Sequence, residues 1–190
     1  MICKEDVEEA IEFSPVIMAV KDWEGVERCT QMESKVVFIL FGSICNIAEI
    51  VKKVREAGKV AIVHMDLIAG LGNKEVAVDF IKQTTEVDGI ITTRPALIKR
   101  GRELGLFTIL RFFMLDSMAM ENLKKQEEAV SPDMIEILPG VMPKVTKRLV
   151  RKLDVPVICG GLIADREDVM NALQAGAVAI SSTNTEVWKL

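Results

Sequence analysis

Two segments near the end of the chain combine an apolar run with residues that suit anion binding. One ends in Gly160 and Gly161, and the other contains Ser181 and Ser182. In an eight-stranded parallel barrel, the loops after the seventh and eighth strands converge at one face and hold phosphate through backbone N–H groups. Glycine lets the backbone approach such a ligand closely, and serine adds a hydroxyl donor. We therefore predict that these four residues bind a phosphate group.

Polar side chains also lie late in, or just after, several other apolar runs: Asp66, Arg94, Arg111 and Glu136. Barrel ligand sites are built at the carboxyl ends of strands, so we expect a polar ring there. Arg111 and Glu136 lie on sequential strands and are expected to form a charge-assisted pair, which leaves Arg94 to meet an anionic ligand. Structural ion pairs above the core are the alternative. For His64, a satisfied core residue is the preferred interpretation.

Eight apolar runs must position these residues, and charged helical stretches separate them. Buried parallel strands read as continuous apolar runs and need helical crossovers between them. The predicted strands are Pro15–Val20, Val36–Phe41, Val60–Met65, Gly89–Thr92, Phe107–Phe112, Met134–Leu138, Val155–Cys159 and Ala177–Ile180. The pattern predicts an α/β fold, a compact (β/α)8 barrel of the TIM type, with residues 1–190 forming a single domain. An open doubly wound sheet is the alternative.

Glycines and acidic residues mark the ends of the predicted helices. Gly58, Gly105 and Gly176 each stand where a helix should end before the next strand. Asp116 and Asp165 are placed to cap the beginnings of two other helices. The connections between elements are therefore expected to be short.

Composition narrows the classes of partner. The net charge of −4 argues against broad attraction to nucleic acid or anionic membranes. Cys3, Cys29, Cys45 and Cys159 form no CxxC pair, and with a single histidine they match no familiar zinc set. We expect buried, reduced thiols, no metal, no cofactor and no membrane association. The acidic N-terminus does not resemble a signal peptide, so a cytoplasmic location is expected.

Two groups of basic residues fall on predicted helices. They are Lys147, Arg148, Arg151 and Lys152 in one group, and Lys99, Arg100 and Arg102 in the other. The first group shares one helix face, because its members are spaced at i, i+1, i+4 and i+5. Either group could contact RNA phosphates, whereas a solvated amphipathic face is the alternative interpretation.

Several of these segments together resemble the glycerol-3-phosphate-responsive antiterminator family, which regulates bacterial glycerol uptake operons. The segments that carry the resemblance are 64–70 (HMDLIAG), 89–94 (GIITTR), 111–116 (RFFMLD), 135–140 (IEILPG), 159–163 (CGGLI) and 181–184 (SSTN). They occur in order over about two thirds of the chain. Ala69 departs from the polar residue that relatives often carry at this position.

The resemblance implies a non-enzymatic transcription regulator of glycerol metabolism. Such a protein senses glycerol 3-phosphate and then acts on leader mRNA to prevent premature termination. Carried over by position, Gly160, Gly161, Ser181 and Ser182 would take the phosphate. The glycerol end would be surrounded by Asp66, Arg94, Arg111 and Glu136. For the RNA, the helix face with Lys147, Arg148, Arg151 and Lys152 is our candidate.

Fold alone cannot exclude an enzyme that acts on sugar phosphates. An isomerase, epimerase or lyase that uses Asp66 or Glu136 as acid or base is the alternative function. A Schiff-base aldolase needs a lysine at the end of a strand. Lys35 and Lys59 precede their strands, and we expect that no lysine ends one. The sequence is also compatible with a homo-oligomer.

Overall fold

The eight predicted strands form a closed, all-parallel barrel in the computed structural model, which describes residues 4–190. The strands are β1 (Val16–Val20), β2 (Val36–Ile39), β3 (Val60–His64), β4 (Gly89–Thr92), β5 (Phe107–Phe113), β6 (Met134–Leu138), β7 (Val157–Gly160) and β8 (Ala179–Ser182). They follow one another in sequence order, and β1 pairs with β8 to close the barrel. The predicted (β/α)8 fold is confirmed, and the doubly wound alternative is wrong.

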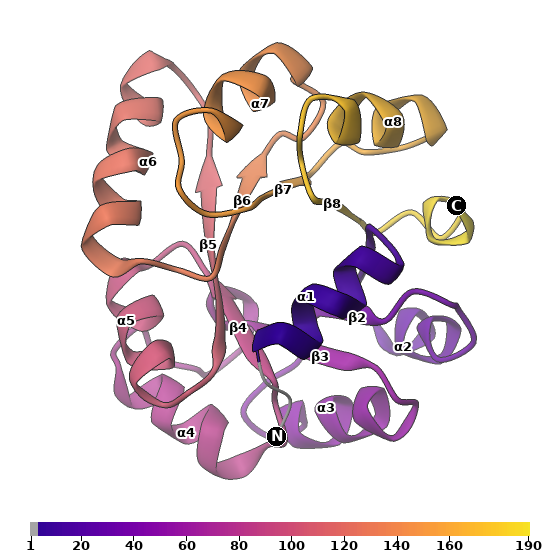
Figure 1. The fold of residues 1–190 in the computed structure, drawn as a ribbon. Coiled ribbons are helices and arrows are strands. Elements are labelled where there is room, and N and C mark those ends of the chain that lie inside the picture. Colours follow the sequence, from indigo (N-terminus) through magenta and orange to yellow (C-terminus); the bar gives the residue numbers. More distant parts are fainter. Residues whose placement is uncertain (1–3) are drawn as a thin grey trace.

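Helices surround the strands as a ring (Figure 1). They are α2 (Trp23–Cys29), α3 (Ile47–Glu56), α4 (Val76–Thr84), α5 (Pro95–Glu103), α6 (Ser117–Val130), α7 (Pro143–Val150) and α8 (Arg166–Gln174), with a short turn η1 (Met65–Leu67) after β3. Gly58, Gly105 and Gly176 have φ of 71°, 69° and 102°, as helix-ending glycines should. The side chains of Asp116 and Asp165 accept a backbone N–H at the beginning of α6 and α8, as predicted.

An additional helix, α1 (Lys4–Phe13), covers the N-terminal end of the barrel. Its buried side chains Val7 and Ile11 belong to the same apolar cluster as the first residues of several strands, including Phe107 and Met134. Figure 1 shows α1 inside the ring of the other helices. Apolar packing therefore closes this end, which leaves the carboxyl ends of the strands as the polar end.

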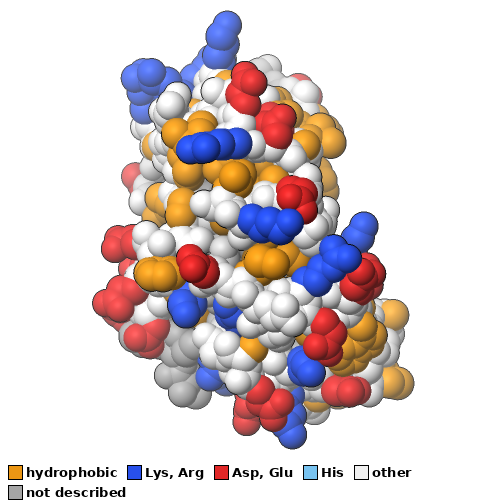
Figure 2. All heavy atoms as spheres, turned by 90° about the vertical axis from the view of Figure 1, so that its right-hand side faces the viewer, with side chains coloured by type: hydrophobic (Ala, Val, Ile, Leu, Met, Phe, Trp, Pro, Cys, Tyr) orange, Lys and Arg blue, Asp and Glu red, His pale blue; other side chains and the backbone are white. Residues whose placement is uncertain are grey.

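No full helix follows β8 in the part of the chain that the structure describes. Only a short turn, η2 (Val187–Lys189), lies between α8 and α2. A groove of about 650 Å³ results, with Val16 and Trp188 among its lining residues and Phe13 and Leu190 exposed at its edges. Figure 2 shows this side of the molecule, where hydrophobic side chains lie among charged ones.

The cysteines only partly match the expectation. Cys29 and Cys159 are buried, and burial raises the pKa of both thiols, that of Cys29 to about 11. Cys45, by contrast, is exposed, so the expectation of buried thiols is wrong for this residue. It precedes α3 at the surface, outside the packed layer. Cys3 lies outside the described residues.

Candidate ligand site at the carboxyl ends of the strands

Alternation along the strands determines which side chains enter the barrel. The inner apolar cluster contains Ile62, Ile109, Met134, Ile158 and Ala179. Two residues further along each of these strands, the same face carries the next layer. That layer consists of His64, Arg111, Glu136, Gly160 and Ser181, and we call it the mouth layer. Four of the eight predicted ligand residues thus come together at one end of the barrel.

Glu136 lies at the centre of the mouth layer and is fully buried. Arg111 donates from Nε to its Oε2 at 2.6 Å, which is the predicted pair. Ser181 donates from its hydroxyl to Oε1 at 2.5 Å. A Cβ on Gly160 would lie 2.4 Å from the same Oε1, so glycine is required here by the approach of the carboxylate. Both oxygens of Glu136 are therefore committed to protein donors.

Ser181 and Gly160 reach Glu136 because β7 and β8 end later than predicted. The sequence pattern placed their ends at Cys159 and Ile180, whereas Gly160 pairs with Ser181 as a strand residue. Both strands are displaced by one or two residues toward the carboxyl end. The side chain of Ser181 consequently points into the barrel instead of lying in a loop.

Asp66 organises the neighbouring strand end. Its carboxylate accepts hydrogen bonds from the Thr92 hydroxyl at 3.0 Å and the Thr93 N–H at 2.8 Å. Arg94 also pairs with it, with 3.0 Å between Nη1 and Oδ1. Arg94, which we expected to be left for an anionic ligand, therefore already has a carboxylate partner. Because 42% of the Arg94 side chain remains exposed, a ligand still has access to it.

His64 is buried as expected, but its polar atoms are not satisfied. Within residues 4–190, neither ring nitrogen has a hydrogen-bond partner, and Nδ1 lies 3.8 Å from Oδ2 of Asp66. Burial, followed by the nearby positive charge of Arg111, lowers the pKa of His64 to about 4. Leaving a buried donor or acceptor unpaired costs about 1–3 kcal/mol. The prediction of a satisfied core histidine is wrong.

The loops after β7 and β8 are tied to each other. Ser182 donates from its hydroxyl to the carbonyl of Ile163 at 2.8 Å, and Asn184 donates from Nδ2 to the carbonyl of Ala164 at 2.8 Å. Gly161 has a φ of 72°, in the left-handed region that favours glycine. Since the hydroxyls of Ser181 and Ser182 both have protein partners, an anion here must depend mainly on backbone N–H groups and on a cation nearby.

Lys21 is the cation that the sequence analysis missed. It directly follows β1, so the expectation that no lysine ends a strand is wrong. Lys21 is exposed, and within residues 4–190 it makes no ion pair. Together with Thr183 of the β8 loop and the acidic residues Asp22 and Glu24, it lines a hollow of about 220 Å³. Val20-Lys21 at the end of an apolar run was the signal that could have identified it.

The two basic groups differ in how their charges are used. Arg100 pairs with Asp79 and Glu103, and Arg102 donates to the carbonyl of Val130. The α5 group is therefore largely structural. The α7 group is exposed at the end of its helix and beyond it, and its members make no ion pair in the described chain: Lys147, Arg148, Arg151 and Lys152.

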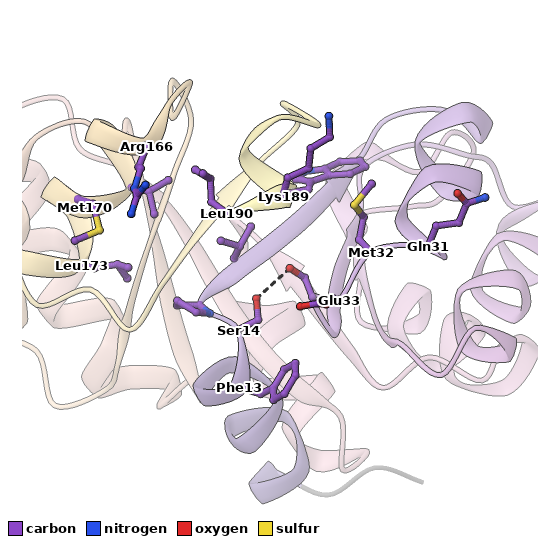
Figure 3. Close-up of a pocket in the computed structure, with 15 residues that line it drawn as sticks. Phe13, Ser14, Gln31, Met32, Glu33, Arg166, Met170, Leu173, Lys189 and Leu190 are labelled. Carbon is purple, nitrogen blue, oxygen red and sulfur yellow. Dashed lines mark hydrogen bonds between the residues drawn. The ribbon is translucent and has the colours of Figure 1, made fainter.

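The groove beside η2 is separate from the mouth layer. Figure 3 shows Arg166, Met170 and Leu173 of α8 on one side and Met32 and Glu33 on the other. None of the predicted ligand residues lines it. The groove is on the outside of the barrel, so the mouth remains the candidate ligand site.

Comparison with known proteins connects this geometry to a family. A profile of the family described as "Glycerol-3-phosphate responsive antiterminator" matches residues 16–188. The chain belongs to this family. Among the antiterminator structures, the glycerol uptake operon antiterminator regulatory protein from Listeria monocytogenes str. 4b F2365 has a TM-score of 0.89 and is 32% identical, with 92% of this chain and 95% of that chain covered.

Two further proteins are similar to this antiterminator-family chain over most of their length. A glycerol uptake operon antiterminator-related protein from Thermotoga maritima MSB8 has a TM-score of 0.83 and 34% identity, covering 92% of this chain and 98% of its own. "Uncharacterized protein YgcP" from Escherichia coli (strain K12) is 48% identical over 177 residues, which are 93% of each chain. The resemblance inferred from the sequence motifs is confirmed.

More distant structures share the fold of this antiterminator-family chain and no more. They include a deoxyribose phosphate aldolase from Aeropyrum pernix, with a TM-score of 0.70 at 14% identity. An N-acetylmannosamine-6-phosphate 2-epimerase from Clostridium perfringens has the same TM-score at 16% identity. Within residues 4–190, no helix is long and apolar enough to cross a membrane.

Proposed function

We propose that this antiterminator-family protein binds glycerol 3-phosphate at the mouth of its barrel and then binds leader mRNA to prevent termination. The observation that carries the proposal is the mouth layer, where Arg111 and Glu136 meet next to the glycine- and serine-containing ends of β7 and β8. A phosphorylated polyol needs donors for its phosphate beside polar groups that can hydrogen-bond its hydroxyls, and residues of both kinds occur at this end.

In this proposal the phosphate lies against the loops after β7 and β8. Gly161 gives the close backbone approach, and Lys21 supplies a positive charge beside Thr183. The glycerol end then points toward Arg111 and the Asp66–Arg94 pair. The hydroxyl of Ser181 positions Glu136, and that of Ser182 positions the loop after β7. They would contribute to phosphate binding only by exchanging these partners for the ligand.

The alternative of acid–base catalysis by Asp66 or Glu136 is less well supported. Both oxygens of Glu136 accept hydrogen bonds from protein groups, so neither is available as a free acid or base. Asp66 accepts from three successive residues of the next strand end. A Schiff-base lysine is activated by desolvation or a neighbouring cation, whereas Lys21 is exposed. These observations favour a binding protein.

The ligand half of the proposal is tested by calorimetric titration with sn-glycerol 3-phosphate, with glycerol, inorganic phosphate and triose phosphates as comparators. We expect selective binding without turnover. Arg94→Ala should weaken glycerol 3-phosphate much more than inorganic phosphate, because Arg94 is assigned to the glycerol end. Lys21→Ala is the matched variant and should weaken both ligands by a similar factor. Equal losses in Arg94→Ala would contradict its assignment.

The RNA half is tested by reversing charge on the α7 group. The triple variant Lys147→Glu, Arg148→Glu and Arg151→Glu should lose binding to the leader RNA of a glycerol uptake operon and keep its affinity for glycerol 3-phosphate. Phosphate contacts by Lys and Arg dominate RNA affinity, and their loss is strongly unfavourable. A control with three exposed lysines outside both basic groups reversed has the same net charge: Lys35, Lys52 and Lys125. Equal RNA binding by both triple variants would show that the α7 face does not contact RNA and is only a solvated surface.

A further inference from the structure

His64 is a buried polar residue that the fold does not use. Its residue surface is 2% exposed, and within residues 4–190 neither Nδ1 nor Nε2 has a hydrogen-bond partner. By contrast, Glu136 and Ser181 in the same layer are bonded to each other. Buried polar groups in native proteins are almost always paired, so this exception calls for an explanation.

The His64 imidazole lies where the far end of a ligand bound in the mouth would reach. In a closed barrel of eight sequential strands, β3 is opposite β7, so His64 lies across the barrel from Gly160 and Gly161. Arg111 is near enough for its charge to affect the imidazole. It uses Nε for Glu136, and its two terminal nitrogens make no hydrogen bond with the described residues.

The protonation state of the ring determines what it can recognise. A pKa of about 4 keeps His64 neutral at physiological pH. A neutral imidazole offers one N–H donor and one acceptor nitrogen, which matches a hydroxyl group because a hydroxyl also donates and accepts. It does not match a phosphate, which is mainly an acceptor at this pH. The chemistry of His64 therefore differs from that of Lys21 and Arg94.

We propose that His64 is a specificity-determining residue that hydrogen-bonds a hydroxyl of a polyol phosphate whose phosphate group lies at the β7 and β8 loops. This inference rests on the proposed function and adds the part of the ligand that is recognised. The phosphate provides attraction to the mouth, and His64, together with the free nitrogens of Arg111, distinguishes a hydroxylated carbon chain from a plain alkyl chain.

The test compares three phosphate esters in titrations of the whole chain: sn-glycerol 3-phosphate, 3-hydroxypropyl phosphate and propyl phosphate, which lose one hydroxyl at each step. The wild-type protein should bind them with decreasing affinity. His64→Leu should lose at least about 10-fold in affinity for glycerol 3-phosphate and less than about 3-fold for propyl phosphate, because only the hydroxyl interactions are removed. His64→Gln keeps a donor and an acceptor and should lie between these values.

Unfolding of the unliganded variants in urea distinguishes recognition from a structural role. Leucine removes two unpaired buried groups, so the midpoint of His64→Leu should equal or exceed that of the wild type. Equal loss of all three esters, or no loss of any, would overturn the inference. If the wild type binds glycerol 3-phosphate but His64→Leu keeps the full hydroxyl discrimination, only this inference fails. If the wild type binds none of the esters, the proposed function fails with it.

Discussion

The two ends of the barrel are built from the same eight strands and carry opposite chemistry. At the N-terminal end, Val7 and Ile11 of α1 pack against strand residues such as Phe107 in an apolar cluster. At the other end, Arg111 and Glu136 face inward two residues beyond Ile109 and Met134 of the same cluster. The N-terminal end buries apolar surface, and the mouth layer holds charged side chains away from water.

This difference separates what stabilises the protein from what is available for binding. The N-terminal end stabilises the fold through the hydrophobic effect, which depends on buried area and not on direction. The interactions in the mouth layer depend on direction, because each buried charge must keep a specific partner. We therefore expect substitutions at the two ends to be distinguishable when stability and ligand affinity are measured together.

The largest effect is expected from Arg111→Met. It leaves the fully buried carboxylate of Glu136 without its cation, and breaking a buried pair in this way costs about 3–5 kcal/mol of unfolding free energy. Replacing both residues, as in Arg111→Met with Glu136→Met, should recover most of that loss while glycerol 3-phosphate binding stays absent. Urea unfolding and calorimetry measure the two properties. If Arg111→Met were as stable as the wild type, the Arg111–Glu136 pair would not be needed for stability.

The second-largest effect is expected in the pH dependence of stability, and it comes from His64 in the mouth layer. The pKa of His64 is lowered to about 4 in the folded protein from 6.5, so between these values the unfolded chain binds the additional proton. Stability should therefore fall as the pH decreases from about 6.5 to 4, by up to about 3 kcal/mol from this group. His64 is the only histidine. The wild-type curve minus the His64→Leu curve isolates its effect, and a flat difference would rule it out.

The smallest effect is expected at the apolar end. Ile11→Val removes one methylene group from the cluster beneath the barrel and should cost about 0.5–1.5 kcal/mol of unfolding free energy. The affinity for glycerol 3-phosphate should not change, because α1 lies at the opposite end from the mouth layer. A parallel decrease in ligand affinity would show that the two ends are coupled and would weaken the comparison.

Regular features of the chain were predictable because they depend on local chemistry. The eight apolar runs identified all the strands, and Gly58, Gly105 and Gly176 marked helix ends because a left-handed φ favours glycine there. The Arg111–Glu136 pair was also predictable, since the two residues lie at the same height on adjacent strands. In each case the neighbours that matter are close in sequence or fixed by strand order.

The features that were missed depend on the pairing register and on side chains from distant elements. Whether Ser181 lies in a loop or in β8 is decided by its pairing with Gly160. The pairing of Arg94 with Asp66 and the absence of a partner for His64 require the three-dimensional positions of neighbouring strand ends. Lys21 differs from these, because its place after an apolar run was visible in the sequence.

The helix α1 also has a consequence for the timing of ligand exchange. Since Val7 and Ile11 cover the bottom of the barrel and its interior is filled with side chains, a molecule held at the mouth has one route in and the same route out. Entry and departure then cross a common barrier formed by the loops around the mouth. A change that only raises or lowers this barrier alters the association and dissociation rates by the same factor, so residence time can change without any change in equilibrium affinity.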